Sequence, residues 1–162
     1  MFNLQTKIYI KIIFLFSFIA LISAYFVEHI LGHQPCNLCL IERIPYVLSI
    51  ILISTMFLLK KNEKFFILLL IFTFIFSFAI SLYHFGIEQS FFEESSVCGV
   101  KNFSESITKE ELMNQLSEKR ISCKDVTFRV FGFSLTLLNI MVSIILLFLV
   151  SIAFKYYEKI KN

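Results

Sequence analysis

Four long runs of apolar residues, separated by polar stretches, dominate this chain. They cover residues 12–26, 44–59, 65–83 and 130–154, and none contains a charged side chain. A helix needs about 20 residues to cross a hydrocarbon core of about 30 Å, so the last two runs suffice and the first two must borrow from their flanks. The pattern predicts an all-α bundle of four transmembrane helices, spanning about 12–31, 42–59, 65–83 and 130–154.

Two other interpretations of these runs are weaker. Helices of a soluble bundle carry a polar stripe along one side, and these runs show none. A cleaved signal peptide would also place an apolar run after Lys7 and Lys11, but no small-x-small cleavage site follows it. We therefore expect a single membrane domain over residues 1–162, with the first run kept in the mature protein.

The charges indicate how the spans are oriented. The 162 residues are 57% apolar, and the net charge of +3 comes without a long basic cluster, which argues against nucleic-acid binding. Lysines fall in the amino-terminal arm, in the loop between the second and third runs, and in the tail, and such segments usually face the cytoplasm. The outer loops are then residues 29–43 and 84–129.

All four cysteines lie in these two outer loops, on the oxidising side of the membrane. Cys36 and Cys39 form a CxxC motif, whose small ring stabilises little as a static disulfide and is better suited to redox cycling. Structural disulfides and a four-thiolate zinc site remain alternatives. Zinc ligands commonly come as two closely spaced pairs, whereas Cys98 and Cys123 lie far apart, so we predict no metal site.

Arg43 follows Cys39 by four residues, which is one turn if the second helix begins near the motif. A guanidinium there would favour a thiolate on Cys39 and could hydrogen-bond a carbonyl oxygen of a bound acceptor. The alternative is an interfacial anchor that reaches the headgroups and pairs with Glu42.

Three segments carry a specific resemblance: PCNLCLIER, then LYHFGIEQ at the end of the third run, then SCKDVTFRVFGFSLTLLN entering the fourth. Together they resemble the bacterial disulfide bond formation protein B (DsbB) family, over about residues 29–139. The resemblance implies a multi-pass protein of the bacterial inner membrane whose cysteine loops face the periplasm. It also implies a membrane quinone reductase that drives disulfide formation in exported proteins.

The resemblance implies a relay of electrons through both cysteine pairs. A periplasmic DsbA-like thioredoxin-fold dithiol protein would attack Cys98 of a Cys98–Cys123 disulfide. Exchange with a Cys36–Cys39 disulfide would then carry the electrons to a quinone, either ubiquinone or menaquinone. Cys39 would contact the quinone as the thiolate donor, Arg43 would hold it, and His84 is a candidate quinone neighbour.

Two other function classes are kept in view. A vitamin K epoxide reductase-like enzyme also combines four helices with a CxxC, but that motif typically comes late in the bundle. A non-enzymatic membrane scaffold with structural disulfides would tolerate loss of Cys36 and Cys39. Between the second-loop cysteines, Thr108 and Glu111 fit a capping box, which predicts a short helix over residues 109–119.

Overall fold

The computed structural model describes residues 4–59, 62–93, 98, 122–124, 129–130 and 132–161. Within these ranges, four helices are long and apolar enough to cross a membrane, which confirms the predicted four-helix membrane fold. The spans are formed by α1 (Leu4–His29), α2 with α3 (Asn37–Ile41 and Ile44–Leu59), α4 (Glu63–Glu88) and α6 (Leu135–Lys161). The predicted helix over residues 109–119 lies outside the described residues.

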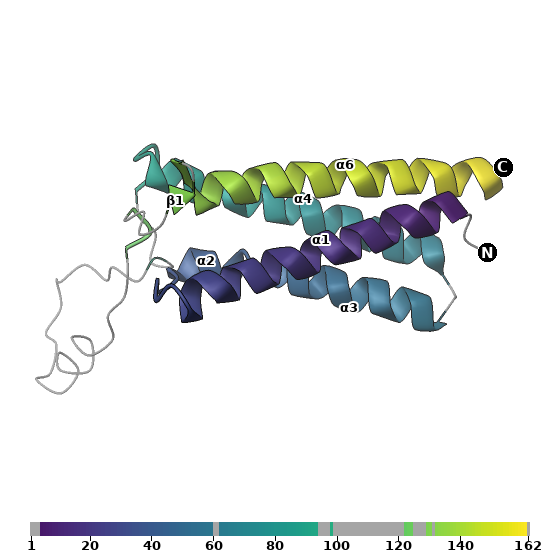
Figure 1. Cartoon of the computed structure of the whole chain (residues 1–162). Coiled ribbons are helices and arrows are strands. Elements are labelled where there is room, and N and C mark those ends of the chain that lie inside the picture. Colours follow the sequence, from purple (N-terminus) through teal and green to yellow (C-terminus); the bar gives the residue numbers. More distant parts are fainter. Residues whose placement is uncertain are drawn as a thin grey trace, which may run out of the picture.

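The four long helices lie side by side in one layered bundle (Figure 1). α1 packs against α3 and α6, and α4 packs against the same two helices, so each helix has two main neighbours. Buried apolar side chains from all four helices form the core, among them Ile10, Ile53, Phe74 and Leu146. Many large apolar side chains face outward, including Phe16, Phe72 and Phe148. An apolar exterior over an apolar core is what a lipid environment requires.

Hydroxyl pairs join the helices where the core holds polar side chains. Ser17 of α1 and Ser49 of α3 lie 2.9 Å apart, and Ser77 of α4 and Ser143 of α6 lie 2.9 Å apart. All four side chains are buried. Because such small residues let helix backbones approach closely and satisfy each other's hydrogen bonds, they are typical of helix contacts in membranes.

The second span is broken near its outer end, which the apolar pattern did not predict. α2 ends at Ile41 and α3 begins at Ile44, with Glu42 and Arg43 in the turn between them. Pro45 explains the break, because a proline has no N–H to donate and its ring clashes with the carbonyl four residues earlier. The break separates the cysteine motif on α2 from the body of the span on α3.

Other helix ends also differ from the predicted spans. α1 begins at Leu4, eight positions before the predicted start, and α4 continues to Glu88 beyond the predicted end at residue 83. The predicted start of the fourth span at residue 130 is replaced by a small hairpin of β1 (Arg129–Val130) and β2 (Phe133–Ser134), paired in antiparallel register. Gly132 turns this hairpin with a φ of 86°, a conformation that glycine adopts without strain.

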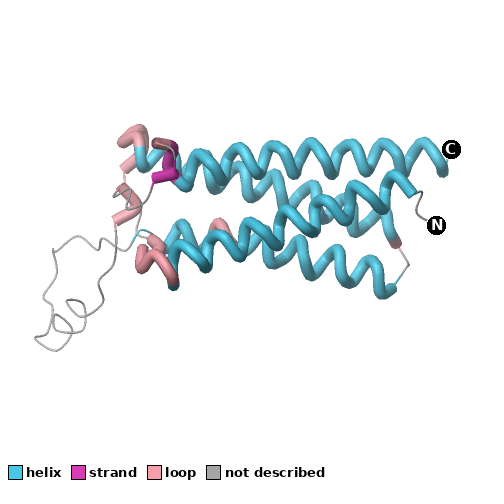
Figure 2. The backbone as a smooth tube through the Cα atoms, in the orientation of Figure 1, coloured by secondary structure: helices cyan, strands magenta, loops and turns pink. Residues whose placement is uncertain are grey.

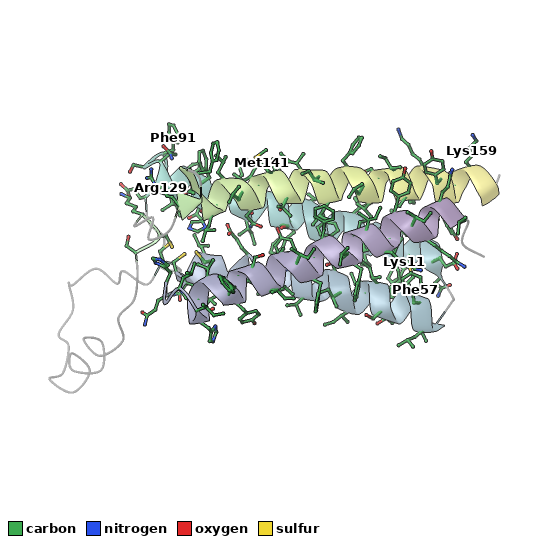
Figure 3. All side chains as sticks on the ribbon, in the orientation of Figure 1. Lys11, Phe57, Phe91, Arg129, Met141 and Lys159 are labelled. Atoms are coloured by element: carbon green, nitrogen blue, oxygen red, sulfur yellow. A yellow bond between two sulfur atoms is a disulfide. The ribbon has the colours of Figure 1, made fainter. Side chains whose placement is uncertain are left out.

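The two ends of the bundle differ in chemistry. Both termini lie at one end, and α2 with β1 lies at the other (Figure 1). Figure 3 shows Lys11 and Lys159 at the terminal end and Arg129 at the opposite end. The loops and turns that the structure describes gather mainly at the α2 end (Figure 2). The described loops and turns that join the helices therefore lie mainly at the end of the bundle that holds α2.

Candidate functional site

The CxxC motif lies at the start of α2, and Cys36 caps this helix. Its backbone is extended, with φ −72° and ψ 167°, and its sulfur accepts a hydrogen bond from the Cys39 backbone N–H at 3.2 Å. The preceding residue is Pro35, which favours an extended entry into the helix. The cap therefore turns the Cys36 sulfur back toward the first turn, where Cys39 lies.

Within the described residues, Cys36 and Cys39 form no disulfide. Their sulfurs lie 2.7 Å apart, and the Nε2 atom of His84 lies 3.6 Å from the Cys36 sulfur. The pKa of Cys36 is lowered from 9.0 to about 5, first by the hydrogen bond from the Cys39 thiol. Burial raises this pKa, and the hydrogen bond and charge of His84 lower it further. These contacts together favour the thiolate form of Cys36.

His84 is held from its other side by Glu42. Its Nδ1 atom donates to Glu42 Oε1 at 3.0 Å, and both side chains are buried, at 3% and 8% exposed. The sequence placed His84 at the end of the third span, but it lies within α4, facing the turn between α2 and α3. A buried carboxylate on Nδ1 fixes the orientation of the ring, so that Nε2 faces the Cys36 sulfur.

Arg43 lines the same cavity as Cys39 and contacts α1. Its guanidinium donates to Glu28 Oε2 at 2.5 Å and lies over the Tyr25 ring, 5.0 Å from the centroid. A turn lies between α2 and α3, so the one-turn relation between Cys39 and Arg43 stays a prediction. Among the described residues, the basic side chain that contacts the Cys36 sulfur is His84.

The second cysteine pair is packed directly on the first. Cys98 and Cys123 form a disulfide, as the family resemblance implied. The implied Cys36–Cys39 disulfide is absent, and the two cysteines are free thiols here. All four cysteines belong to one buried cluster with Leu38 and Ile87, in which Cys98 is 1% exposed and Cys123 is 4% exposed. The two pairs therefore pack in the same cluster at the α2 end of the bundle.

A cavity of about 530 Å³ opens beside this cluster. Its walls are mostly apolar and come from α1 and α6, for example Ile19 and Leu138. Its polar lining includes both cysteines of the motif, Cys123, and the charged or titratable side chains of His84, Glu42, Glu28 and Arg43. This volume and this mixture are typical of a site for a small organic molecule.

Comparison with known proteins agrees with these features. The family model described as "Disulfide bond formation protein DsbB" matches residues 6–153. The chain belongs to the DsbB family. It is also 28% identical to the protein named "Uncharacterized protein RP370" of Rickettsia prowazekii (strain Madrid E), over 142 residues that cover 86% of this chain and 83% of the relative. No solved structure matches the chain.

Family membership makes this protein a membrane thiol-disulfide oxidoreductase that acts in disulfide bond formation. The described helices agree, since the chain crosses the membrane several times. Both cysteine pairs lie within the matched residues, and so do Arg43 and His84. Every site residue predicted from the sequence therefore lies inside the stretch that the DsbB family model matches, and the role of each stays a prediction.

A hydrogen-bonded group of polar side chains inside the bundle was not predicted from the sequence. The Nδ2 atom of Asn139 donates to Ser81 Oγ at 2.7 Å, and its Oδ1 accepts from the Tyr46 hydroxyl. Asn139 and Tyr46 also line the cavity. The signal was present in the sequence, because Asn139 is an amide inside an otherwise apolar run, and polar residues in membrane spans usually face other helices or a cavity.

One cluster in the site has the composition of a metal site. The sulfurs of Cys36 and Cys39 and a ring nitrogen of His84 all lie within 4.8 Å of one another. The four-thiolate zinc site considered from the sequence does not form, because Cys98 and Cys123 are bonded to each other. The possible ligands thus come from the motif and from α4.

Proposed function

We propose that this DsbB-family protein is a protein-dithiol:quinone oxidoreductase that reoxidises a periplasmic DsbA-like thioredoxin-fold protein. The observation that carries the proposal is the packing of the Cys98–Cys123 disulfide against the reduced Cys36 and Cys39, beside a cavity lined by Arg43. A structural scaffold has no use for two free thiols in contact with a disulfide. A relay of electron pairs requires this proximity.

In the first step, a thiolate of the partner attacks the Cys98 sulfur. The Cys98–Cys123 bond breaks, a mixed disulfide forms, and Cys123 leaves as a thiolate. The second thiol of the partner then displaces Cys98, so the partner is oxidised and the Cys98 and Cys123 pair takes up two electrons. Such exchange is fastest when the attacking sulfur is a thiolate and the leaving sulfur has a low pKa.

In the second step, the Cys98 and Cys123 thiols reduce a Cys36–Cys39 disulfide. One thiolate attacks a sulfur of the motif, and the second thiol closes the Cys98–Cys123 disulfide again. The products are a reduced Cys36 and Cys39 pair and a Cys98–Cys123 disulfide. Packing of both pairs in one cluster supports this order of exchange.

The cavity fits a quinone in size and chemistry. Its volume of about 530 Å³ lies within the usual range for small organic ligands. Arg43 and His84 are the residues that would hold the ring, and the apolar walls on α1 and α6 suit an isoprenoid chain. A bound quinone supplies the acceptor for two electrons and two protons.

The side chains around the motif are arranged to supply charge and protons. Cys39 lines the cavity and is only half-buried, so it is the sulfur that we assign as the donor. Its thiol lies 2.7 Å from the Cys36 sulfur, so a Cys36 thiolate can take up the Cys39 proton as Cys39 reacts with the acceptor. Arg43 donates hydrogen bonds that stabilise negative charge on an acceptor oxygen. Glu42 keeps the His84 Nδ1 proton in place.

We also propose that the α2 end faces the periplasm and that the membrane is the bacterial inner membrane. Lys7, Lys11, Lys64, Lys155 and Lys159 belong to the segments at the other end of the bundle, and lysines near span ends favour the cytoplasmic side. An oxidising compartment around the cysteine pairs agrees with the Cys98–Cys123 disulfide.

The test is quinone reduction by the purified full-length chain, supplied with a reduced DsbA-like protein and followed by quinone absorbance. We expect Cys39→Ser to abolish turnover and Arg43→Ala to raise the quinone KM. Arg129→Ala is the matched control, because Arg129 is an exposed arginine at the same end of the bundle. Equal turnover in the intact, Cys39→Ser and Arg43→Ala proteins, or no turnover in folded intact protein, would refute the proposal.

A further inference from the structure

The cluster of Cys36, Cys39 and His84 offers three metal ligands of the kinds that zinc prefers. The sulfurs and the ring nitrogen come from two elements, α2 with its cap and α4, that lie far apart in the sequence. Cys36 and His84 are buried and Cys39 is half-buried, so the cluster is not a chance grouping on the surface. Thiolate and imidazole ligands are typical of zinc sites.

Two of the three distances between the ligand atoms can be compared directly with tetrahedral coordination, and the third, from the Cys39 sulfur to the His84 ring, is within 4.8 Å. Zinc bonds of about 2.3 Å to sulfur and about 2.05 Å to nitrogen, at the tetrahedral angle, separate sulfur from nitrogen by about 3.5 Å and two sulfurs by about 3.8 Å. The Cys36 sulfur lies 3.6 Å from His84 Nε2, which already matches. The two sulfurs, at 2.7 Å, must move apart by about 1 Å, which a rotation of the half-buried Cys39 side chain provides.

The environment of His84 is that of a metal-binding histidine. Glu42 accepts the Nδ1 proton at 3.0 Å, which leaves Nε2 as the atom that faces the sulfurs. A carboxylate on the far nitrogen fixes the tautomer and the orientation of most ligating imidazoles and raises their basicity. Glu42 is buried, so this orientation is maintained by the packing of the turn between α2 and α3.

A fourth coordination position is open to the cavity. Cys36, Cys39 and His84 all line it, so a metal held by these three residues would face a space large enough for a water molecule. Three protein ligands and one exchangeable ligand is the composition of open zinc sites. The same cavity gives the ion a way in and out.

We propose that the reduced Cys36 and Cys39 pair binds a thiophilic divalent metal ion, Zn²⁺ in particular, together with His84. Binding releases the protons that the two sulfurs still hold, transfers no electrons, and requires both sulfurs to be free of a disulfide. Only the reduced motif can therefore bind. A bound ion occupies both sulfurs, so it stops their reoxidation. This consequence rests on the proposed quinone reduction, whereas the binding itself does not.

The experiment titrates the full-length chain in detergent with Co²⁺, which reports tetrahedral thiolate coordination by its absorption, and then displaces Co²⁺ with Zn²⁺. A Cys98→Ser/Cys123→Ser background leaves only the motif thiols, and a phosphine reduces them and is removed. We expect one equivalent of Co²⁺ per chain, no such spectrum after oxidation of the motif, and at least about tenfold weaker binding in His84→Ala.

Two further variants keep the test decisive. His29→Ala removes an exposed histidine at the same end of the bundle and should bind Co²⁺ like the background protein. If His84→Ala does not fold, His84→Cys should restore a thiolate spectrum with one more sulfur ligand. Binding within about twofold of the background by folded His84→Ala, or equal binding by the oxidised chain, would overturn the site.

The outcomes separate this proposal from the proposed function. Co²⁺ binding without quinone turnover would leave the metal site standing and overturn the quinone assignment. Quinone turnover by a chain that shows no Co²⁺ spectrum would overturn the metal site alone. Where both hold, Zn²⁺ should inhibit turnover, and a chelator should restore it.

Discussion

Replacing His84 should raise the pKa of Cys36 without returning it to the value of a free thiol. The Nε2 atom lies 3.6 Å from the Cys36 sulfur, and its hydrogen bond and charge both favour the thiolate. A hydrogen bond to a charged group contributes about 1.5–3 kcal/mol, and one pKa unit corresponds to about 1.36 kcal/mol. His84→Gln should therefore move the Cys36 pKa from about 5 to about 6–7. The Cys39 thiol, which is the larger cause, remains.

The assay is the pH dependence of Cys36 alkylation by iodoacetamide in the reduced chain, with Cys98 and Cys123 replaced by serine and the modified residue identified by mass spectrometry. His29→Gln is the control, since its ring bonds the Tyr25 carbonyl of its own helix. A midpoint near 9 in the intact motif, or the same midpoint with and without His84, would refute the reasoning.

The same shift links the stability of the reduced chain to pH. Because the folded-state pKa of Cys36 is lowered, the stabilisation is fully present above the unfolded value of 9.0 and is lost as the pH falls toward about 5. The oxidised chain has no thiol at this position and lacks the effect. A stable thiolate favours the reduced motif, which makes its disulfide a stronger oxidant.

Three other outcomes follow from the site. The reduction potential of the Cys36–Cys39 pair, measured against glutathione, should fall by about 30 mV per pH unit between pH 5 and 8 and by about 60 mV per pH unit below pH 5. The slope is smaller above the pKa of Cys36 because reduction then takes up one proton fewer. Glu28→Gln should raise the quinone KM several-fold with little change in kcat, since Glu28 orients Arg43. Asn139→Ala should lower the free energy of unfolding by about 1–3 kcal/mol, seen as a lower Tm, because Ser81 and Tyr46 lose a buried partner.

The number and order of the spans could be predicted from the sequence because membrane helices are read by composition alone. Each apolar run became a helix. The ends could not be predicted as well, since a helix continues beyond the hydrocarbon wherever its backbone hydrogen bonds are satisfied. α4 thus extends past His84 to Glu88, and α1 reaches back to Leu4. Pro45 was the one readable sign that the second span would break.

The members of the site could be predicted by residue type, but their partners could not. Cysteines, Arg43 and His84 stand out in an apolar chain, and the family resemblance connects them. The contact between Glu42 and His84 joins residues 42 positions apart, and that between Tyr46 and Asn139 joins residues 93 positions apart. Such contacts depend on which helix faces lie together, and uniformly apolar helices carry little periodic signal to fix their rotation.

The contacts of Glu42 and Arg43 illustrate why side-chain partners could not be predicted from the sequence. As neighbours in the sequence they were natural partners for each other, yet each binds a different helix: Glu42 reaches His84 on α4, and Arg43 reaches Glu28 on α1. Adjacent residues in a helical turn point in different directions. The turn between α2 and α3 therefore places the Glu42 carboxylate beside His84 and the Arg43 guanidinium beside Glu28. Glu42 thereby orients the ring beside Cys36, while Arg43 lies at the cavity wall, where we propose that it holds the acceptor.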